Sequence, residues 1–65
     1  MGIELGRQLA ELRKAKELTQ VQFAEVSGVS STYIARIEKG HHLPSVEMLQ
    51  RLLVPLGAKL TIISE

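Results

Sequence analysis

The sequence contains no cysteine and no tryptophan, and its only aromatic residues are Phe23 and Tyr33. Without cysteine, neither a disulfide nor a cysteine-ligated metal can stabilise the fold. No apolar run approaches the roughly 20 residues that a transmembrane helix needs. The first residues also lack the basic and apolar stretches of a signal peptide. These absences predict a small cytoplasmic protein with an aliphatic core and no membrane partner.

The chain is short and nearly neutral. Its 65 residues leave room for one hydrophobic core, so we expect a single domain over residues 1–65. Such a small core often gains burial from a partner subunit. The net charge of +1 does not by itself indicate a polyanionic partner, although a basic face can exist on a neutral protein. Between residues 27 and 45 the only acid is Glu38, beside Arg36 and Lys39.

Hydrophobic periodicity predicts two helices in the first part of the chain. Leu5, Leu9 and Leu12 recur at helical spacing, which predicts an amphipathic helix over residues 3–17. Thr19 and Gln22 form a capping box, in which each side chain bonds to the backbone amide of the other residue. This box predicts the start of a second helix that ends at residues 27–28. Its expected inward side chains are Phe23, Ala24 and Val26.

Two further helices are predicted. Ser30 is the expected N-cap of a helix over residues 31–39 that Gly40 terminates. Ser45 is the expected N-cap of a fourth helix, which should end at about residue 53 or 54 because Pro55 lacks an amide proton. The inward residues of these two helices are expected to be Ile34, Ile37, Val46, Met48, Leu49, Leu52 and Leu53.

Residues 58–64 are rich in β-branched side chains and partly alternate, which predicts a strand after a turn at Gly57. A lone strand leaves its edge amides unpaired, so we expect it to pair with the same strand of a second subunit. A frayed tail and a fifth helix are the alternatives. The predicted fold class is therefore all-α with a short C-terminal strand. The side chains expected in the dimer strand are Leu60, Ile62 and Ile63.

Residues 19–40 contain two short helices separated by three residues, which is a tight helix-turn-helix. This core resembles the phage-repressor (Cro/cI, Xre) family of DNA-binding domains, and the resemblance extends from residue 5 to about residue 57. It implies a lambda-repressor-like bundle of four to five helices. The residues that carry the resemblance are Thr19–Gln20, Ala24, Gly28, Ile34, Ile37, Glu38–Lys39–Gly40 and Pro44.

The resemblance implies a set of DNA-contacting residues. A helix that is anchored on one face and polar on the other can enter the major groove. Base reading is assigned to Ser31, Thr32 and Arg36, and Arg36 is the expected discriminator because its guanidinium can bond bidentately to guanine. For Tyr33, packing against the fourth helix is the alternative to a DNA contact. Contact with the DNA backbone is assigned to Gln20, Tyr33, Lys39, Gly40, His41 and His42.

The resemblance also implies an internal ion pair between Arg13 of the first helix and Glu38. We expect this pair to be structural and to remove Glu38 from the DNA-facing surface, although both groups could instead be solvated. The adjacent His41 and His42 suggest a metal site, but vicinal histidines diverge and no cysteine or nearby carboxylate completes it. No metal, cofactor or catalytic residue is therefore expected, and the chain is not expected to be an enzyme.

The sequence predicts a sequence-specific, double-stranded DNA-binding transcriptional regulator. Two half-sites need a rigid dimer, so we expect a homodimeric repressor of a palindromic operator. Residues 57–62 also resemble the subunit-joining strand of HipB-type antitoxins, which implies an autoregulating antitoxin with a toxin partner as a narrower function. The alternative from another class is a protein-interaction module that keeps this fold without binding DNA.

Overall fold

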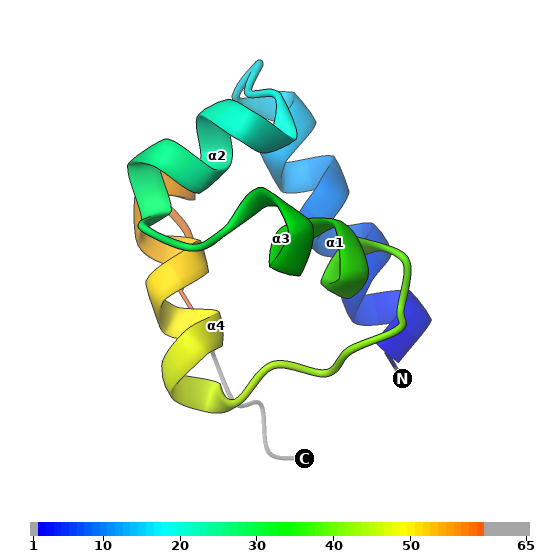
Figure 1. The fold of residues 1–65 in the computed structure, drawn as a ribbon. Coiled ribbons are helices and arrows are strands. Elements are labelled where there is room, and N and C mark those ends of the chain that lie inside the picture. The colour runs from blue at the N-terminus through cyan, green and yellow to red at the C-terminus, as the bar shows by residue number, and fades with distance from the viewer. Residues whose placement is uncertain (1, 60–65) are drawn as a thin grey trace, which may run out of the picture.

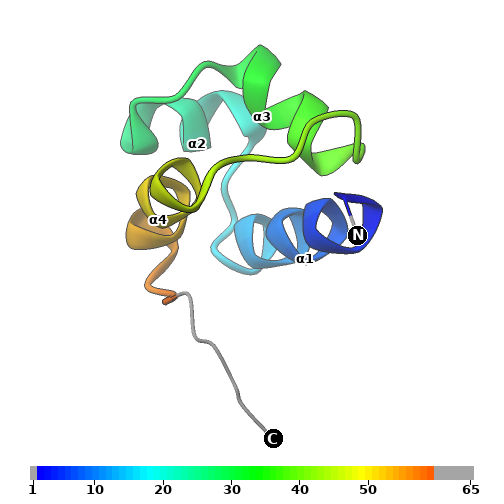
Figure 2. The same cartoon turned by 90° about the horizontal axis from the view of Figure 1, so that it is seen from below.

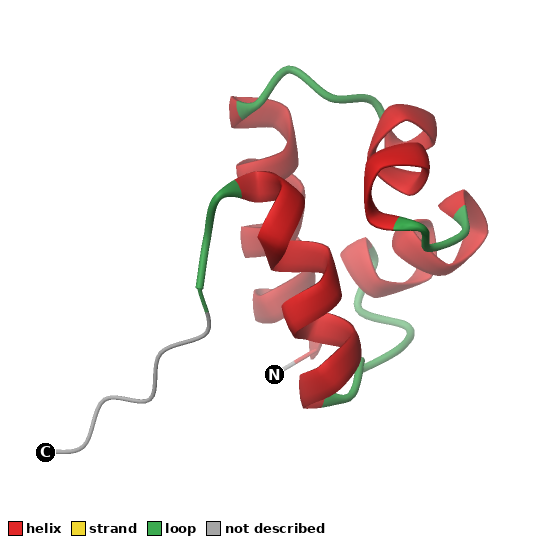
Figure 3. Cartoon of the chain, turned by 90° about the vertical axis from the view of Figure 1, so that its left-hand side faces the viewer, coloured by secondary structure: helices red, strands yellow, loops and turns green. Residues whose placement is uncertain are grey.

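The structure is a computed structural model that describes residues 2–59. Figure 1 labels the four helices, and in Figure 2 helices α2 and α3 lie together on one side of the molecule, with α1 and α4 on the other. Within residues 2–59 the chain forms helices and loops but no strand (Figure 3). The elements in chain order are α1 (Gly2–Ala15), α2 (Gln20–Ser27), α3 (Ser31–Glu38), α4 (Val46–Leu53) and the 3-10 helix η1 (Val54–Leu56).

The predicted caps begin α2, α3 and α4. The Thr19 hydroxyl accepts a hydrogen bond from the Gln22 amide at 3.0 Å, and the Gln22 side chain accepts one from the Thr19 amide at 2.9 Å. The hydroxyls of Ser30 and Ser45 each accept from an amide three residues later, at 3.1 Å. These bonds satisfy amides that helix starts leave without intrahelical partners. The capping predictions are therefore confirmed.

The C-terminal ends of the helices lie close to the ends predicted from the sequence. Gly28 ends α2 with a φ of +74°, and Gly57 follows η1 with a φ of +67°. Pro55 does not continue α4, which ends at Leu53 and passes into η1. The first helix is shorter than expected, because α1 ends at Ala15 and the chain turns there to lead into α2.

The core is aliphatic apart from Phe23, which is completely buried. Ile34 and Ile37 of α3 are also fully buried, as the pattern predicted. These side chains join α3 to the other three helices, since they pack in one cluster with residues of α1, α2 and α4. The buried apolar residues are Leu9, Phe23, Val29, Ile34, Ile37, Leu49, Leu52, Leu53 and Leu56.

Two inward predictions are wrong, those for Val26 and Val46. Val26 is 56% exposed because the inward stripe of α2 follows the residues at positions 20, 23, 24 and 27, and Val26 lies outside it. Val46 is 61% exposed because it is the first residue of α4 and precedes the buried stripe that begins at Leu49. Leu12 is also 39% exposed, so the leucine stripe of α1 is only partly covered.

The predicted strand over residues 58–64 lies largely outside the described residues. Of this segment the structure describes Ala58 and Lys59, and neither belongs to a strand. Leu60, Ile62 and Ile63, expected in the dimer strand, lie outside the described residues. The described part of the chain is thus a four-helix, all-α fold. No helix within residues 2–59 combines the length and apolar character needed to cross a membrane.

Gly6 permits α1 to approach the end of α3, a contact that the sequence analysis did not anticipate. A Cβ atom at Gly6 would overlap the carbonyl oxygen of Ile37 and lie 2.7 Å from the carbonyl oxygen of Glu38. Both obstacles are backbone atoms, which cannot move aside as the end of a flexible side chain can. The absence of a side chain at position 6 therefore sets the distance between the two helices.

We expect Gly6→Ala to lower the free energy of unfolding by a net 1–2 kcal/mol or so, as measured by urea denaturation. Alanine favours an isolated helix by up to about 1 kcal/mol, but overpacking against fixed backbone costs about 1–3 kcal/mol. Glu11→Ala, at an exposed position of the same helix, is the control. Equal stability of the two variants would contradict the close approach.

Candidate functional site

The outward face of α3 carries the residues that the sequence analysis assigned to base reading. Ile34 and Ile37 hold the opposite face of this helix in the core, with no side-chain exposure. Thr32 and Arg36 are exposed and Ser31 is half-buried. The three polar side chains thus lie on a rigid helix at the surface, and the anchoring isoleucines fix how that helix is presented.

Arg13 and Glu38 lie together beneath this helix. The Arg13 Nε donates to Glu38 Oε2 at 2.8 Å, and its Nη2 donates to Glu38 Oε1 at 3.1 Å. The third nitrogen, Nη1, donates to the carbonyl oxygen of Leu18 at 2.7 Å. The two side chains are 10% and 7% exposed, so this is a buried, bidentate pair. It joins α1 to the last residue of α3 and to the loop before α2.

Gln20 takes part in the same network instead of pointing outward. Its side-chain amide donates to Glu38 Oε1 at 3.0 Å. The sequence analysis assigned this amide to a DNA phosphate, and in the structure one of its two hydrogens is bound inside the protein. Glu38 accepts bonds from both Arg13 and Gln20, so its negative charge is matched by buried donors. Gln20 therefore helps to hold α3 against the start of α2.

Tyr33 and His42 form a second contact, at the surface. The Tyr33 hydroxyl lies 2.8 Å from His42 Nε2, within hydrogen-bonding distance. The two rings meet edge to face, with centroids 4.7 Å apart and an interplanar angle of 64°. This contact ties α3 to the loop that follows it. Tyr33 is also half-buried and packs against the core cluster, which includes leucines of α4, while its hydroxyl reaches this loop.

The loop after α3 is also held from the other side, at Gly40. Gly40 has a φ of +78°, and a Cβ atom there would lie 2.7 Å from Cγ1 of Ile3. The loop therefore passes close to the start of α1. Lys39 and His41 remain exposed on either side of this glycine. The loop residues expected to contact the DNA backbone thus lie next to the C-terminal end of α3.

The exposed charges of this region are positive. Between residues 27 and 45, Arg36 and Lys39 are exposed, whereas Glu38 is paired with Arg13 beneath the surface. A face with this charge attracts a polyanion even though the whole chain is nearly neutral. Within residues 2–59 no group of three or more histidine, cysteine or acidic side chains could hold a metal ion.

A family model described as a helix-turn-helix domain matches residues 4–61. The chain is 36% identical over 62 residues to the ImmF control region 10 kDa protein of Bacillus phage phi105, covering 95% of this chain and 69% of that protein. It is 41% identical over 61 residues to an uncharacterized HTH-type transcriptional regulator of Haemophilus influenzae, a match that covers 94% of this chain and 62% of that regulator. The chain is also 36% identical over 59 residues to the immunity repressor protein of Bacillus phage phi105. This match covers 91% of this chain and 41% of the repressor.

Solved structures share the arrangement of these helices. The restriction-modification controller protein C.AhdI of Aeromonas hydrophila superposes with a TM-score of 0.84 at 32% identity, over 88% of this chain and 86% of that one. The clp gene regulator ClgR of C. glutamicum superposes with a TM-score of 0.85 at 34% identity, over 89% of this chain and 74% of that one. The chain spans less than two thirds of the H. influenzae regulator and of the phage immunity repressor.

We expect Arg13→Ala to lower the free energy of unfolding by about 3–5 kcal/mol, because it leaves the buried Glu38 carboxylate without its main partner. A double-mutant cycle with Glu38→Ala, measured by urea denaturation, should give a coupling energy of about 1–3 kcal/mol.

Arg7→Ala is the matched control for this cycle. Arg7 lies on the same helix and pairs with Glu4, but the two side chains are 64% and 59% exposed. Arg7→Ala should therefore lower the free energy of unfolding much less than Arg13→Ala does. If Arg7→Ala and Arg13→Ala destabilise the protein equally, the buried pair does not hold the helices together.

Proposed function

The chain belongs to the helix-turn-helix family, and from this premise we propose that it is a sequence-specific, dimeric repressor of a palindromic operator. The named relatives are a phage control-region protein, transcriptional regulators and a phage repressor. The protein is accordingly a DNA-binding transcriptional regulator and not an enzyme. The operator, the dimer and the direction of regulation are the proposed parts.

The observation that carries the proposal is the placement of Glu38. This residue is the only acid between residues 27 and 45, and it is buried against Arg13. Within residues 27–45, the outward side of α3 and the following loop therefore offer the exposed Arg36 and Lys39 to a phosphate backbone, with no exposed acid in that stretch of sequence. A protein-interaction module with this fold would keep the same buried pair, so DNA binding itself distinguishes the two functions.

We assign base reading to Ser31, Thr32 and Arg36, because Thr32 and Arg36 are exposed on the side of α3 away from its buried isoleucines and Ser31 is half-buried at the start of the helix. Arg36 is the main discriminator through bidentate bonds to guanine. Lys39, Gly40, His41 and His42 follow the helix and contact the DNA backbone, with Tyr33 holding this loop through His42. Gln20 contacts a phosphate with the second hydrogen of its side-chain amide, since only one of the two is bound to Glu38.

The dimer follows from the geometry of DNA. One domain reads one half-site, and two half-sites lie about 34 Å apart along the duplex. A palindromic operator therefore needs two copies held by a two-fold axis, and we assign this role to the segment that follows Gly57. As a DNA-binding regulator the protein acts in the cytoplasm. A narrower function as an autoregulating antitoxin with a toxin partner rests on the resemblance of residues 57–62 alone.

The protein should bind random-sequence duplex DNA at low salt, as measured by fluorescence anisotropy. If Arg36 and Lys39 alone each neutralise one phosphate, raising the salt from about 50 to about 200 mM should weaken binding about tenfold. Lys39→Ala should reduce the slope of log affinity against log salt by about 0.9. Arg51→Ala, which removes an exposed arginine of α4 outside this face, should leave the slope unchanged. No binding at low salt would count against the repressor and in favour of the interaction module.

Arg36→Ala should weaken binding to an operator selected from a random duplex library by about 1–3 kcal/mol and relax the preference at one base pair of each half-site. Arg51→Ala, which removes an exposed arginine of α4, is the control and should keep the preference. Equal losses on operator and random DNA would show that Arg36 contacts a phosphate instead of a base.

A further inference from the structure

Two adjacent histidines, His41 and His42, lie in the loop that follows α3, and both side chains are exposed. The Gly40 amide donates to the carbonyl oxygen of Ile37 at 3.0 Å, and Gly40 has a φ of +78°. The His41 amide donates to the carbonyl oxygen of Arg36 at 2.9 Å, which completes a Schellman motif at the end of α3. The two histidines therefore have a fixed position beside the last turn of this helix.

Tyr33 holds the second of these histidines from the side of α3. Its hydroxyl lies 2.8 Å from Nε2 of His42, and a hydroxyl both donates and accepts hydrogen bonds. The contact is therefore kept when the ring is neutral and Nε2 accepts, and also when the ring is an imidazolium and Nε2 donates. In both states Nδ1 is the ring nitrogen left for a ligand, and in the imidazolium it carries a hydrogen.

The surroundings of the histidines provide no internal counter-ion. Within residues 2–59 neither histidine forms an ion pair with a carboxylate, and Glu4 and Glu38 are paired with arginines of α1. An anion from outside the chain is therefore the partner for an imidazolium at this place. The charged and titratable groups on the elements that adjoin the loop are Glu4, Arg7, Tyr33, Arg36, Glu38, Lys39, Glu47 and Arg51.

Histidine differs from the other basic residues of this face in when it is charged. Arginine and lysine side chains ordinarily stay charged between pH 5 and 8, whereas the ordinary pKa of histidine, about 6.5, lies inside this range. Arg36 and Lys39 offer two positive charges, and protonation of both histidines doubles that number. A phosphate beside an imidazolium stabilises its charged form, so a histidine that contacts DNA takes up a proton on binding.

We propose that DNA binding is coupled to protonation of His41 and His42, so that the affinity for DNA rises as the pH falls from about 8 to about 5.5. This inference rests on the DNA face of the proposed function and adds its regulation. The sign follows from linkage, because acid strengthens a binding step that takes up protons and base weakens it. Tyr33 is a positioning residue, since it holds the His42 ring on α3 and leaves Nδ1 to donate to a phosphate.

The test measures binding to random-sequence duplex DNA by fluorescence anisotropy at about pH 5.5 and about pH 8, each at several salt concentrations. His41→Gln and His42→Gln, singly and together, replace a titrating ring by a side chain that is neutral at both pH values. Lys39→Ala is the matched control, because it removes from the same face a charge that lysine carries at both pH values.

At about 0.1 M salt one phosphate contact by a cation is worth about eightfold in affinity, from the release of about 0.9 counterion. Acid should therefore strengthen binding by roughly five- to tenfold for each histidine and steepen the slope of log affinity against log salt by about 0.9 for each. The double variant should lose both changes. Lys39→Ala should weaken binding by the same factor at both pH values. A double variant that keeps the full pH dependence would overturn the proposal.

Tyr33→Phe tests the positioning role, because it removes the hydroxyl and keeps the ring that packs against the core. The variant should keep its helices by far-UV circular dichroism and most of its affinity at about pH 8. It should lose the same share of the acid effect as His42→Gln. An equal loss of affinity at both pH values, or a pH dependence like that of the unchanged protein, would overturn the role assigned to Tyr33.

The same measurements separate this inference from the proposed function. Binding that is equally strong at both pH values, with an unchanged salt slope, would leave DNA binding in place and overturn the coupling to the histidines. Binding that is coupled to pH but shows no preferred operator would support the coupling and remove sequence-specific repression. Failure to bind at either pH would overturn both, because the coupling needs the phosphate contacts.

Discussion

The carboxylate of Glu38 accepts hydrogen bonds from two parts of the chain, and the position of α3 depends on them. Arg13 reaches it from α1 with two nitrogens, and Gln20 reaches it from the start of α2. The remaining Arg13 nitrogen binds the Leu18 carbonyl, so the loop between α1 and α2 is held as well. Burying a charge pair of this kind costs desolvation energy. The hydrogen bonds made by all three Arg13 nitrogens, together with the bond from Gln20 to Glu38, offset that cost.

Close packing of α1 on the end of α3 makes this network possible. Gly6 lets the two backbones approach, and Gly40 lets the following loop pass beside Ile3. The apolar anchors Ile34 and Ile37 then fix the rotation of α3, which decides which of its side chains face outward. The polar network sets where the helix ends, and the aliphatic core sets which face it presents.

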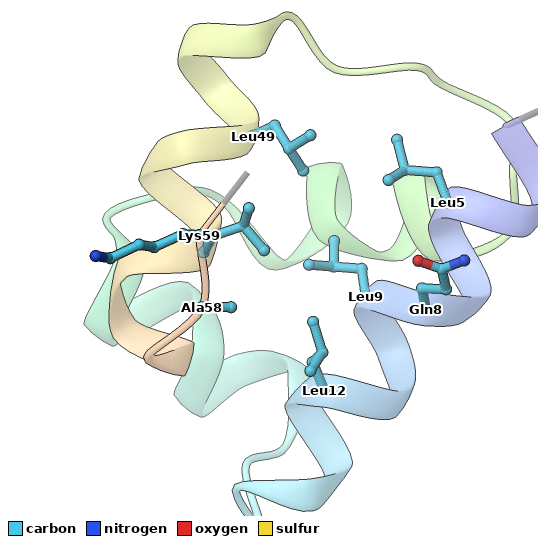
Figure 4. A pocket seen from close by; sticks show the side chains of 8 residues that line it. Leu5, Gln8, Leu9, Leu12, Leu49, Ala58 and Lys59 are labelled. Carbon is cyan, nitrogen blue, oxygen red and sulfur yellow. The ribbon is translucent and has the colours of Figure 1, made fainter. Parts of the chain in front are cut away.

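The two sides of the domain have opposite chemistry. On the side of α2 and α3, burial of Glu38 leaves Arg36 and Lys39 as the exposed charges of the proposed DNA face. On the side of α1 and α4, Leu12 is exposed and Leu5 is half-buried beside the buried leucines between the two helices (Figure 4). The small size of the domain explains the uncovered leucines, because a single small core cannot cover every apolar side chain.

The sequence by itself determined the helices and their caps, because capping and helical periodicity depend on residues three or four positions apart. It also indicated the buried isoleucines and, through family resemblance, the pairing of Arg13 with Glu38. It did not predict the exposure of Val26, the inward bond of Gln20, the contact of Tyr33 with His42 or the need for Gly6. Each of these depends on atoms brought together from distant parts of the chain, so only the tertiary structure decided them.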